Sequence, residues 1–192
     1  MLLFSGGLDS TALAVLLRPE RALTIDYGQV SAPGEVRAAA AISTELGIGH
    51  EVLHCDCSKV GSGLLAGRDP DPVAPVIEWW PFRNQLLITL AGAWALPRGC
   101  KELIVGSVHG DDAHVDGTTA FYERMNRLIS MQEGELAVSA PALSKTTESL
   151  LREVEVPNGL LGFTHSCHRS EWACGLCPGC IKRSETLEAL GR

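Results

Sequence analysis

The stretch MLLFSGGLDST, residues 1–11, decides the fold of this chain. Its first four residues are apolar and predict a short buried strand, and STALAVLL at residues 10–17 predicts a helix. Between them lies a turn with two glycines and a serine. A strand, a glycine turn and a helix N-terminus in this order bind phosphate, because backbone N–H groups and the helix dipole favour an anion there. A plain strand-to-helix turn capped by Asp9 or Ser10 is the alternative.

The loop has no lysine at its end, so it is not a Walker A loop. Around it, alternating apolar and helical stretches predict an α/β fold: a Rossmann-like parallel sheet with helices on both faces and its site at the carboxyl ends of the strands. We expect strands at residues 2–4, 22–25, 51–54, 102–105 and 136–139. We expect helices at residues 10–17, 35–46, 84–96, 120–131, 146–153 and 181–190.

The composition limits the classes of function. The 192 residues are 45% hydrophobic, which suffices for one domain with a core. The net charge of −7 argues against stable nucleic-acid binding, which usually needs a basic surface. No apolar stretch approaches the roughly 20 residues of a membrane span, and the chain begins directly on the predicted strand, without room for a signal peptide. We therefore expect a cytoplasmic protein without a membrane partner.

Two irregular stretches are candidates for binding loops. Residues 58–80 contain several glycines and prolines and predict a lid, a binding loop or a disordered segment. Residues 106–118, GSVHGDDAHVDGT, follow a predicted strand and carry Asp111, Asp112 and Asp116. Such a loop holds a polar ligand or Mg²⁺, or is simply a solvated acidic loop.

Four of the seven cysteines lie close together near the C-terminus: Cys167, Cys174, Cys177 and Cys180. Four thiolates satisfy tetrahedral Zn²⁺ with no open position, which predicts a structural zinc site. An iron–sulfur cluster and a redox thiol pair are the rivals, and His165 and His168 are spare ligands. We expect residues 1–160 to form the nucleotide-binding domain and residues 161–192 a zinc-binding segment with a final helix.

SGGLDS at residues 5–10 resembles the PP-loop of the ATP pyrophosphatases, which grip the pyrophosphate end of ATP and transfer AMP to a substrate oxygen. Together with the four cysteines it resembles the QueC family of 7-cyano-7-deazaguanine synthases, over nearly the whole chain. The family motif F-D-Y-G-Q-R-H matches residues 25–31, with Val30-Ser31 in place of Arg-His, and V-P-G-R-N matches residues 80–84, with Phe82 where glycine is usual. Further partial matches are Glu35, Gly106, Asp111, Asp116, Phe121, Pro141, Lys145, Glu148 and Arg183.

The resemblance implies an adenine nucleotide alpha hydrolase-like fold and a two-stage reaction on 7-carboxy-7-deazaguanine. ATP adenylates the carboxylate, ammonia displaces AMP to give an amide, and a second ATP dehydrates the amide to a nitrile. It implies ATP, Mg²⁺ and Zn²⁺ as cofactors, and homodimers occur among the relatives. The residues it implies for ATP are Ser5, Gly6, Gly7, Leu8, Asp9, Ser10, Thr11, Asp26 and Gln29; for catalysis Lys145, Arg83 and Asp111; for the substrate Tyr27, Asn84, Asp111 and Asp116.

The departures from the family motifs concentrate in the motifs for which the resemblance implies contact with the deazaguanine and with ammonia. The family's Arg-His, the glycine before Arg83, a Ser-Gly-Tyr and a Cys-Arg are absent here. This pattern favours a relative that keeps adenylation and couples the deazaguanine as an amide to a protein amine, as QueC-like proteins of antiphage CBASS-type systems do. Free nitrile synthesis with ammonia is the alternative. A tRNA-thiolating enzyme and a non-catalytic nucleotide-binding module are less favoured.

Overall fold

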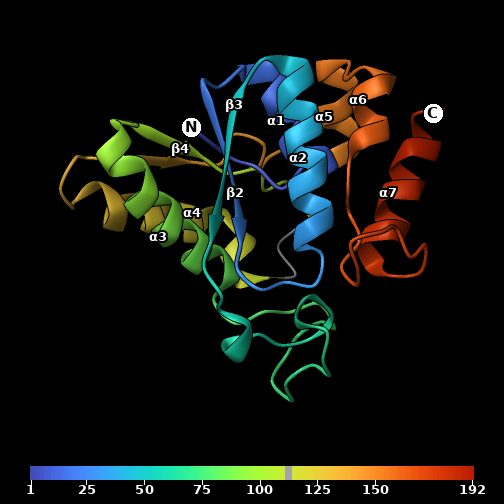
Figure 1. The fold of residues 1–192 in the computed structure, drawn as a ribbon, viewed down its shortest axis with the longest axis horizontal. Coiled ribbons are helices and arrows are strands. Elements are labelled where there is room, and N and C mark those ends of the chain that lie inside the picture. The colour runs from blue at the N-terminus through green and yellow to red at the C-terminus, as the bar shows by residue number, and fades with distance from the viewer. Residues whose placement is uncertain (111–113) are drawn as a thin grey trace.

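The structure, a computed structural model, describes residues 1–110 and 114–192 and is built on one parallel sheet (Figure 1). In the described residues the strand order is β3-β2-β1-β4-β5, and every pairing is parallel. The strands are β1 (Leu2–Leu3), β2 (Arg21–Asp26), β3 (Gly49–His54), β4 (Glu102–Ile104) and β5 (Ala137–Ser139). Strands β1, β4 and β5 lie within the predicted ranges, β2 extends one residue beyond its range at each end, and β3 begins two residues early. The buried strands are found because they read as short apolar runs.

Helices cover both faces of the sheet, as predicted. One face carries α1 (Leu8–Leu17), α2 (Ala32–Leu46), α5 (Thr147–Val154) and α6 (Asn158–Phe163). The other carries α3 (Arg83–Ala95) and α4 (Thr119–Ser130), and α7 (Pro178–Ala189) packs against α5. Two hydrophobic clusters follow from this arrangement, one under each layer of helices.

Four helices differ from the prediction by two residues or more: α1 begins two residues early, α2 and α7 each begin three residues early, and α6 was not predicted. Helix α2 begins at Ala32, three residues early, because Pro33 lies in its first turn, where a missing N–H leaves no bond unmade. Helix α6 was not predicted at all. Its sequence, NGLLGF, has two glycines and low helix propensity, and it is stabilised instead by the burial of Leu160 and Leu161 where α6 packs on α1 and α2.

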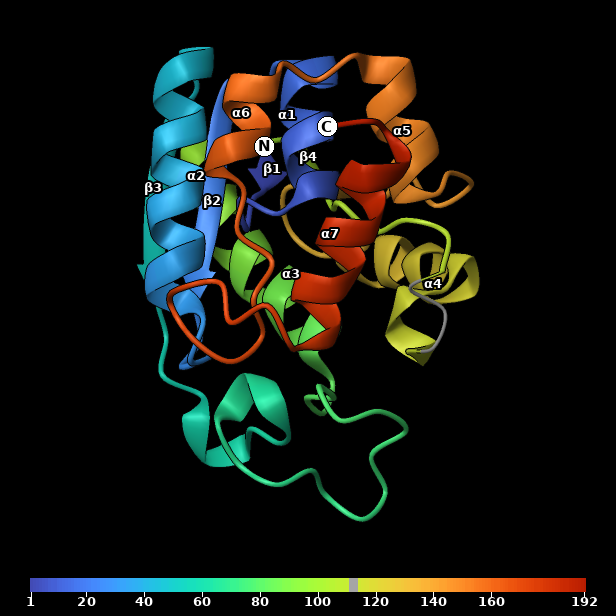
Figure 2. The same ribbon diagram turned by 90° about the vertical axis from the view of Figure 1, so that its right-hand side faces the viewer.

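The order of the strands places a crevice at the end of β1. The chain passes from β1 to β2 and β3 on one side, and later to β4 and β5 on the other. In open parallel sheets the connections diverge at such a switch point, and ligands bind at the carboxyl ends of the strands there. The loop at residues 5–7 follows β1 and lies at this switch point (Figure 2).

Helix α2 packs directly on this loop. Gly6 has φ of +71°, and a Cβ there would lie 2.7 Å from both the Ala38 Cβ and the Ala39 backbone nitrogen. The first glycine of the loop is therefore required both by its backbone conformation and by the close approach of α2.

Residues 58–80 extend from the rest of the fold, below the carboxyl end of β3 in the view of Figure 1. The segment contains two short 3-10 helices, Ser58–Val60 and Leu64–Ala66, and Trp80 at its end is buried in the cluster that contains Ile25 and Tyr27. Within the described part of the chain, the helices are too short or too polar for any of them to cross a bilayer.

Candidate functional site

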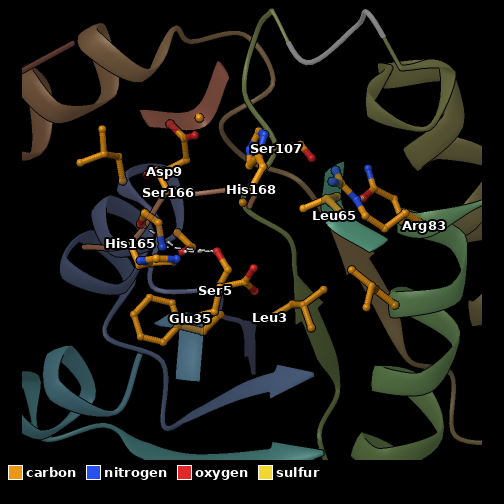
Figure 3. Close-up of a pocket in the computed structure, with 18 of the residues that line it drawn as sticks. Leu3, Ser5, Asp9, Glu35, Leu65, Arg83, Ser107, His165, Ser166 and His168 are labelled. Carbon is orange, nitrogen blue, oxygen red and sulfur yellow. Dashed lines mark hydrogen bonds between the residues drawn. The ribbon is translucent and has the colours of Figure 1, made fainter. Parts of the chain in front are cut away.

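A cavity of about 480 Å³ opens at the carboxyl edge of the sheet. Three parts of the chain meet around it: the loop after β1, the starts of α2 and α3, and the segment before and within α7 (Figure 3). Its polar and charged lining includes Ser5, Asp9, Ser10, Thr24, Tyr27, Glu35, Glu78, Arg83, Asn84, Ser107, His165, Ser166, His168, Lys182 and Arg183.

The loop after β1 leaves the N-terminus of α1 open to a ligand. The N-cap residue is Gly7, which makes no side-chain capping bond, so Asp9 and Ser10 lie inside the helix and do not cap it. The Ser5 Oγ accepts from the Gly7 N–H at 3.3 Å, and the Ser10 hydroxyl donates to the Gly7 carbonyl at 3.2 Å. Because no side chain takes the cap position, first-turn N–H groups can point at an anion, which fits the phosphate reading.

Of the residues predicted to bind ATP, Ser5, Gly7, Leu8, Asp9 and Ser10 line the cavity. Gly6 and Thr11 lie directly behind it, and Thr11 is fully buried. The other two predicted residues have different surroundings: the Asp26 carboxylate accepts from the Gly28 N–H at 3.1 Å and lies 3.1 Å from the His54 Nδ1, and Gln29 is buried under Glu35. Neither belongs to the cavity lining.

The start of α3 supplies a cation to the cavity. Arg83 lines it and shares a hydrogen bond with the phenol of Tyr27. Burial raises the pKa of Tyr27 above its ordinary value, despite the nearby guanidinium, so the phenol stays neutral. Asp116 fixes this turn, since its carboxylate accepts from the Asn84 N–H at 3.0 Å and its carbonyl accepts from the Asn84 side chain at 2.8 Å.

Two of the residues predicted for catalysis lie apart from this cavity or outside the described residues. The Lys145 ammonium pairs with the Glu153 carboxylate, and Lys145 does not belong to the lining. Asp111 lies outside the described residues. Asp116, which was predicted to bind the substrate, accepts a hydrogen bond from Asn84 and does not line the cavity. Tyr27 and Asn84, predicted for the same role, do line it.

Sequence reasoning missed a group of lining residues that come from the far end of the chain. His165, Ser166 and His168 reach the cavity because the His165 N–H donates to the Gly6 carbonyl at 2.9 Å. Lys182 and Arg183 add positive charge from α7. Burial lowers the pKa of both histidines, which favours their neutral forms. No sequence motif near these residues predicts that the chain returns to the loop after β1.

The four predicted cysteines form one cluster beside the cavity. Their sulfur atoms all lie within 4.8 Å of one another, and the pairs Cys167–Cys177 and Cys174–Cys180 are each 3.9 Å apart. Four sulfurs around one ion at Zn–S bonds of about 2.3 Å require separations of this size. A four-iron cluster would hold them further apart, because each thiolate then binds its own iron. The donor set therefore fits a single zinc ion.

Backbone N–H groups point at these sulfurs. His168 donates to Cys177 at 3.3 Å, and Arg169 donates to Cys167 at 3.4 Å. Burial alone would raise the pKa of Cys167, but hydrogen bonds from the backbone of Arg169 and Cys174 and from the side chains of Cys174 and Ser170 outweigh it and lower the pKa to about 6. In the described residues neither histidine joins the four-sulfur group, so His165 and His168 are lining residues rather than ligands.

A parallel α/β sheet with a glycine loop at its switch point and a four-cysteine segment beside it defines a Rossmann-like protein. The chain belongs to the QueC family, since the family model described as Queuosine biosynthesis protein QueC matches residues 1–191. The resemblance seen in the sequence is thereby confirmed.

Curated relatives match over nearly their whole length. A 7-cyano-7-deazaguanine synthase of Desulforudis audaxviator is 30% identical over 218 residues, covering 100% of this chain and 97% of the relative. Proteins of the same name from Methanosarcina barkeri (29% identical, 98% and 93% covered) and Chlorobium phaeovibrioides (26% identical, 100% and 92% covered) are also similar.

Proposed function

We propose that this chain is an ATP-dependent enzyme that activates the carboxylate of 7-carboxy-7-deazaguanine as an acyl adenylate and then joins its carbon to nitrogen. The observation that carries the proposal is the uncapped N-terminus of α1 at the glycine loop, which opens into the same cavity as Arg83. Family membership and the names of the relatives support the choice of a 7-deazaguanine substrate.

The chemistry follows from the weakness of a carboxylate as an electrophile. Attack of the carboxylate oxygen on the α-phosphorus of ATP forms the acyl adenylate and releases pyrophosphate. A nitrogen nucleophile then attacks the acyl carbon, AMP leaves, and one proton is lost from the nitrogen. Attack of the amide oxygen on the α-phosphorus of a second ATP releases a second pyrophosphate, and loss of AMP together with both protons of the amide nitrogen then gives the nitrile.

The lining residues divide the electrostatic tasks of this reaction. The loop holds the pyrophosphate end of ATP, with hydroxyls from Ser5 and Ser10. Arg83 and Lys182 offset the charge that develops on the phosphates, and they take this role in preference to Lys145, which lies apart from the lining. Mg²⁺ would bind at Asp9 together with phosphate oxygens and supply charge neutralisation. Zinc would have a structural role, because the four thiolates leave it no open position.

For the nitrogen donor we propose ammonia, with 7-cyano-7-deazaguanine as the product, because the relatives carry that name. A protein amine, coupled as an amide in antiphage defence, is the second candidate. The specific observation in its favour is Phe82, which stands where the family has glycine and keeps a left-handed φ of +53° with 75% of its surface exposed. A large residue in this strained conformation beside Arg83 alters the rim of the cavity.

One experiment separates the candidates. Purified protein is incubated with ATP, Mg²⁺ and 7-carboxy-7-deazaguanine, with either ammonium or the proteins encoded beside it, and the products are read by mass spectrometry. A free nitrile supports the synthase, and a mass adduct on a neighbouring protein supports the ligase. Asp9→Asn should lose pyrophosphate release, while Glu185→Gln, an exposed change on α7, should retain it. Absence of AMP in both samples would overturn adenylation.

A further inference from the structure

A carboxylate that no family motif assigned a role lies in the cavity wall. Glu35, in the first turn of α2, lines the cavity, and two buried side chains hold it. The Ser31 hydroxyl donates to its Oε1 at 2.6 Å, and the Gln29 amide donates to its Oε2 at 3.1 Å. Ser31 is 0% and Gln29 is 3% exposed, so both donors are protected from water.

The Gln29 side chain is itself fixed. Its Oε1 accepts from the Tyr27 N–H at 2.9 Å, and its Nε2 also donates to the Ile25 carbonyl at 3.3 Å. These bonds define which end of the amide faces Glu35. The end of β2 therefore positions the carboxylate before any ligand arrives, which is the condition for selective binding.

The carboxylate keeps unused acceptor capacity. Two carboxylate oxygens offer about four lone-pair positions, and Ser31 and Gln29 occupy one on each oxygen. Among the described residues, these two donors therefore leave one position on each oxygen. Burial raises the pKa of Glu35, and the bonds from Ser31 and Gln29 offset only part of that effect. A charged group in such surroundings gains strongly from further N–H donors.

The rest of the cavity suits a flat ring with opposite polarity at its two ends. Figure 3 shows Glu35 beside Ser5 on one side and Arg83 on the other, with Leu3 and Leu65 between them in that view. Leu23 and Ile25 add further apolar surface to the lining. A ring edge that carries N–H donors would contact Glu35, and an anionic group at the other end of the ring would contact Arg83.

We infer that Glu35 determines base specificity by accepting the ring N–H and the exocyclic amine of the substrate's guanine-like edge, one on each carboxylate oxygen. This inference rests on the proposed function, because it takes 7-carboxy-7-deazaguanine as the ligand. Two neighbouring donors on one edge match two acceptors, as guanine-type rings present them. The adenine of ATP presents a donor beside an acceptor on its pairing edge, so the same carboxylate disfavours it.

The structure also explains why Glu35 takes this role in preference to the acidic loop. The Asp116 carboxylate accepts from the backbone of α3 and does not belong to the lining, and Asp111 lies outside the described residues. Glu35 combines a place in the lining, two fixed donors and open acceptor positions.

The test compares wild-type protein with Glu35→Gln by pyrophosphate release. The substrates are 7-carboxy-7-deazaguanine and its analogue without the exocyclic amine. A bidentate contact of this kind is worth about 1–3 kcal/mol, or roughly 10–200-fold. We expect the KM of the variant for the substrate to rise by about 100-fold and the KM for ATP to change less than about 3-fold. The wild-type preference for the amine-bearing substrate should shrink by about 10-fold or more.

Ser31→Ala provides a second variant, because it removes one fixed donor and leaves the carboxylate in place. We expect its KM for the substrate to rise by about 5–10-fold, and Glu185→Gln serves as the matched exposed control. If Glu35→Gln does not fold, as judged by circular dichroism, Glu35→Asp replaces it and should show the same loss of discrimination.

Three outcomes would overturn the inference: unchanged discrimination in the variants, a rise in the KM for ATP that equals the rise for the substrate, or a shift in the Mg²⁺ requirement. The last two would assign Glu35 to the nucleotide or its metal ion. Failure of the proposed function is distinct, since wild-type protein would then release no pyrophosphate with 7-carboxy-7-deazaguanine at all.

Discussion

Trp80 should hold residues 58–80 against the sheet. Its side chain is 2% exposed, and its ring meets Tyr27 edge to face with centroids 4.8 Å apart. A buried tryptophan covers about 150–250 Å², which at about 25 cal/mol per Å² corresponds to about 4–6 kcal/mol. The indole N–H has no hydrogen-bond partner among the described residues, which subtracts about 1–3 kcal/mol. Trp80→Ala should therefore lower the free energy of unfolding by about 3 kcal/mol.

The comparison with Trp80→Phe makes the reasoning testable. Phenylalanine keeps a ring against Tyr27 and removes the unpaired N–H, so we expect a loss within about 1 kcal/mol. Urea unfolding gives the free energies, and hydrogen exchange shows whether residues 58–80 open in Trp80→Ala. Trp79→Ala, at the less buried neighbour, is the control. Equal losses in Trp80→Phe and Trp80→Ala would refute the reasoning, because the N–H would then contribute rather than cost.

Three further perturbations test other parts of the molecule. Gly6→Ala should destabilise the protein by about 3 kcal/mol in thermal melts, because the residue has a positive φ and the added Cβ would lie 2.7 Å from its neighbours. Gly7→Ala is the control and should cost less than about 1 kcal/mol, because its added Cβ comes no closer than 3.4 Å to other atoms. Cys177→Ser should reduce bound zinc from one equivalent to none by elemental analysis, and finding iron in the wild type would contradict the zinc assignment. Burial lowers the pKa of His50, so the unfolded chain takes up the imidazole proton at a higher pH than the folded protein does. The free energy of unfolding should therefore fall as the pH drops below about 6.5. His50→Gln should reduce this pH dependence, measured by urea titrations at pH 7.5 and 5.5.

The elements that the sequence predicted best are those whose signal is local. Strands buried on both faces appear as short apolar runs, and the loop at residues 5–7 has a turn chemistry that its own residues determine. Helix α6 was not predicted because tertiary packing, and not the helix propensity of its residues, stabilises it. The early start of α2 has a local cause instead, because Pro33 in the first turn is typical of a helix that begins before Glu35.

The candidate site was only partly predictable, because a strand end fixes a side chain's location but not its direction. Asp26 is the last residue of β2, yet its carboxylate lies against His54 and does not belong to the lining. Lys145 similarly pairs with Glu153. Glu35 had a signal, its place just after the residues that match a family motif, but its contact with Gln29 and Ser31 depends on how the chain turns between β2 and α2.

The contact between His165 and Gly6 has a consequence for biosynthesis. A ribosome makes residues 5–10 long before residues 165–183, which close the same cavity. Because domains generally fold as units once the segments that contact one another have emerged, the sheet can assemble during translation, whereas the cavity is complete only after residues 165–183 have been made. A chain that stops before residue 165 would therefore carry the loop at residues 5–10 without the wall that residues 165–183 add to this cavity.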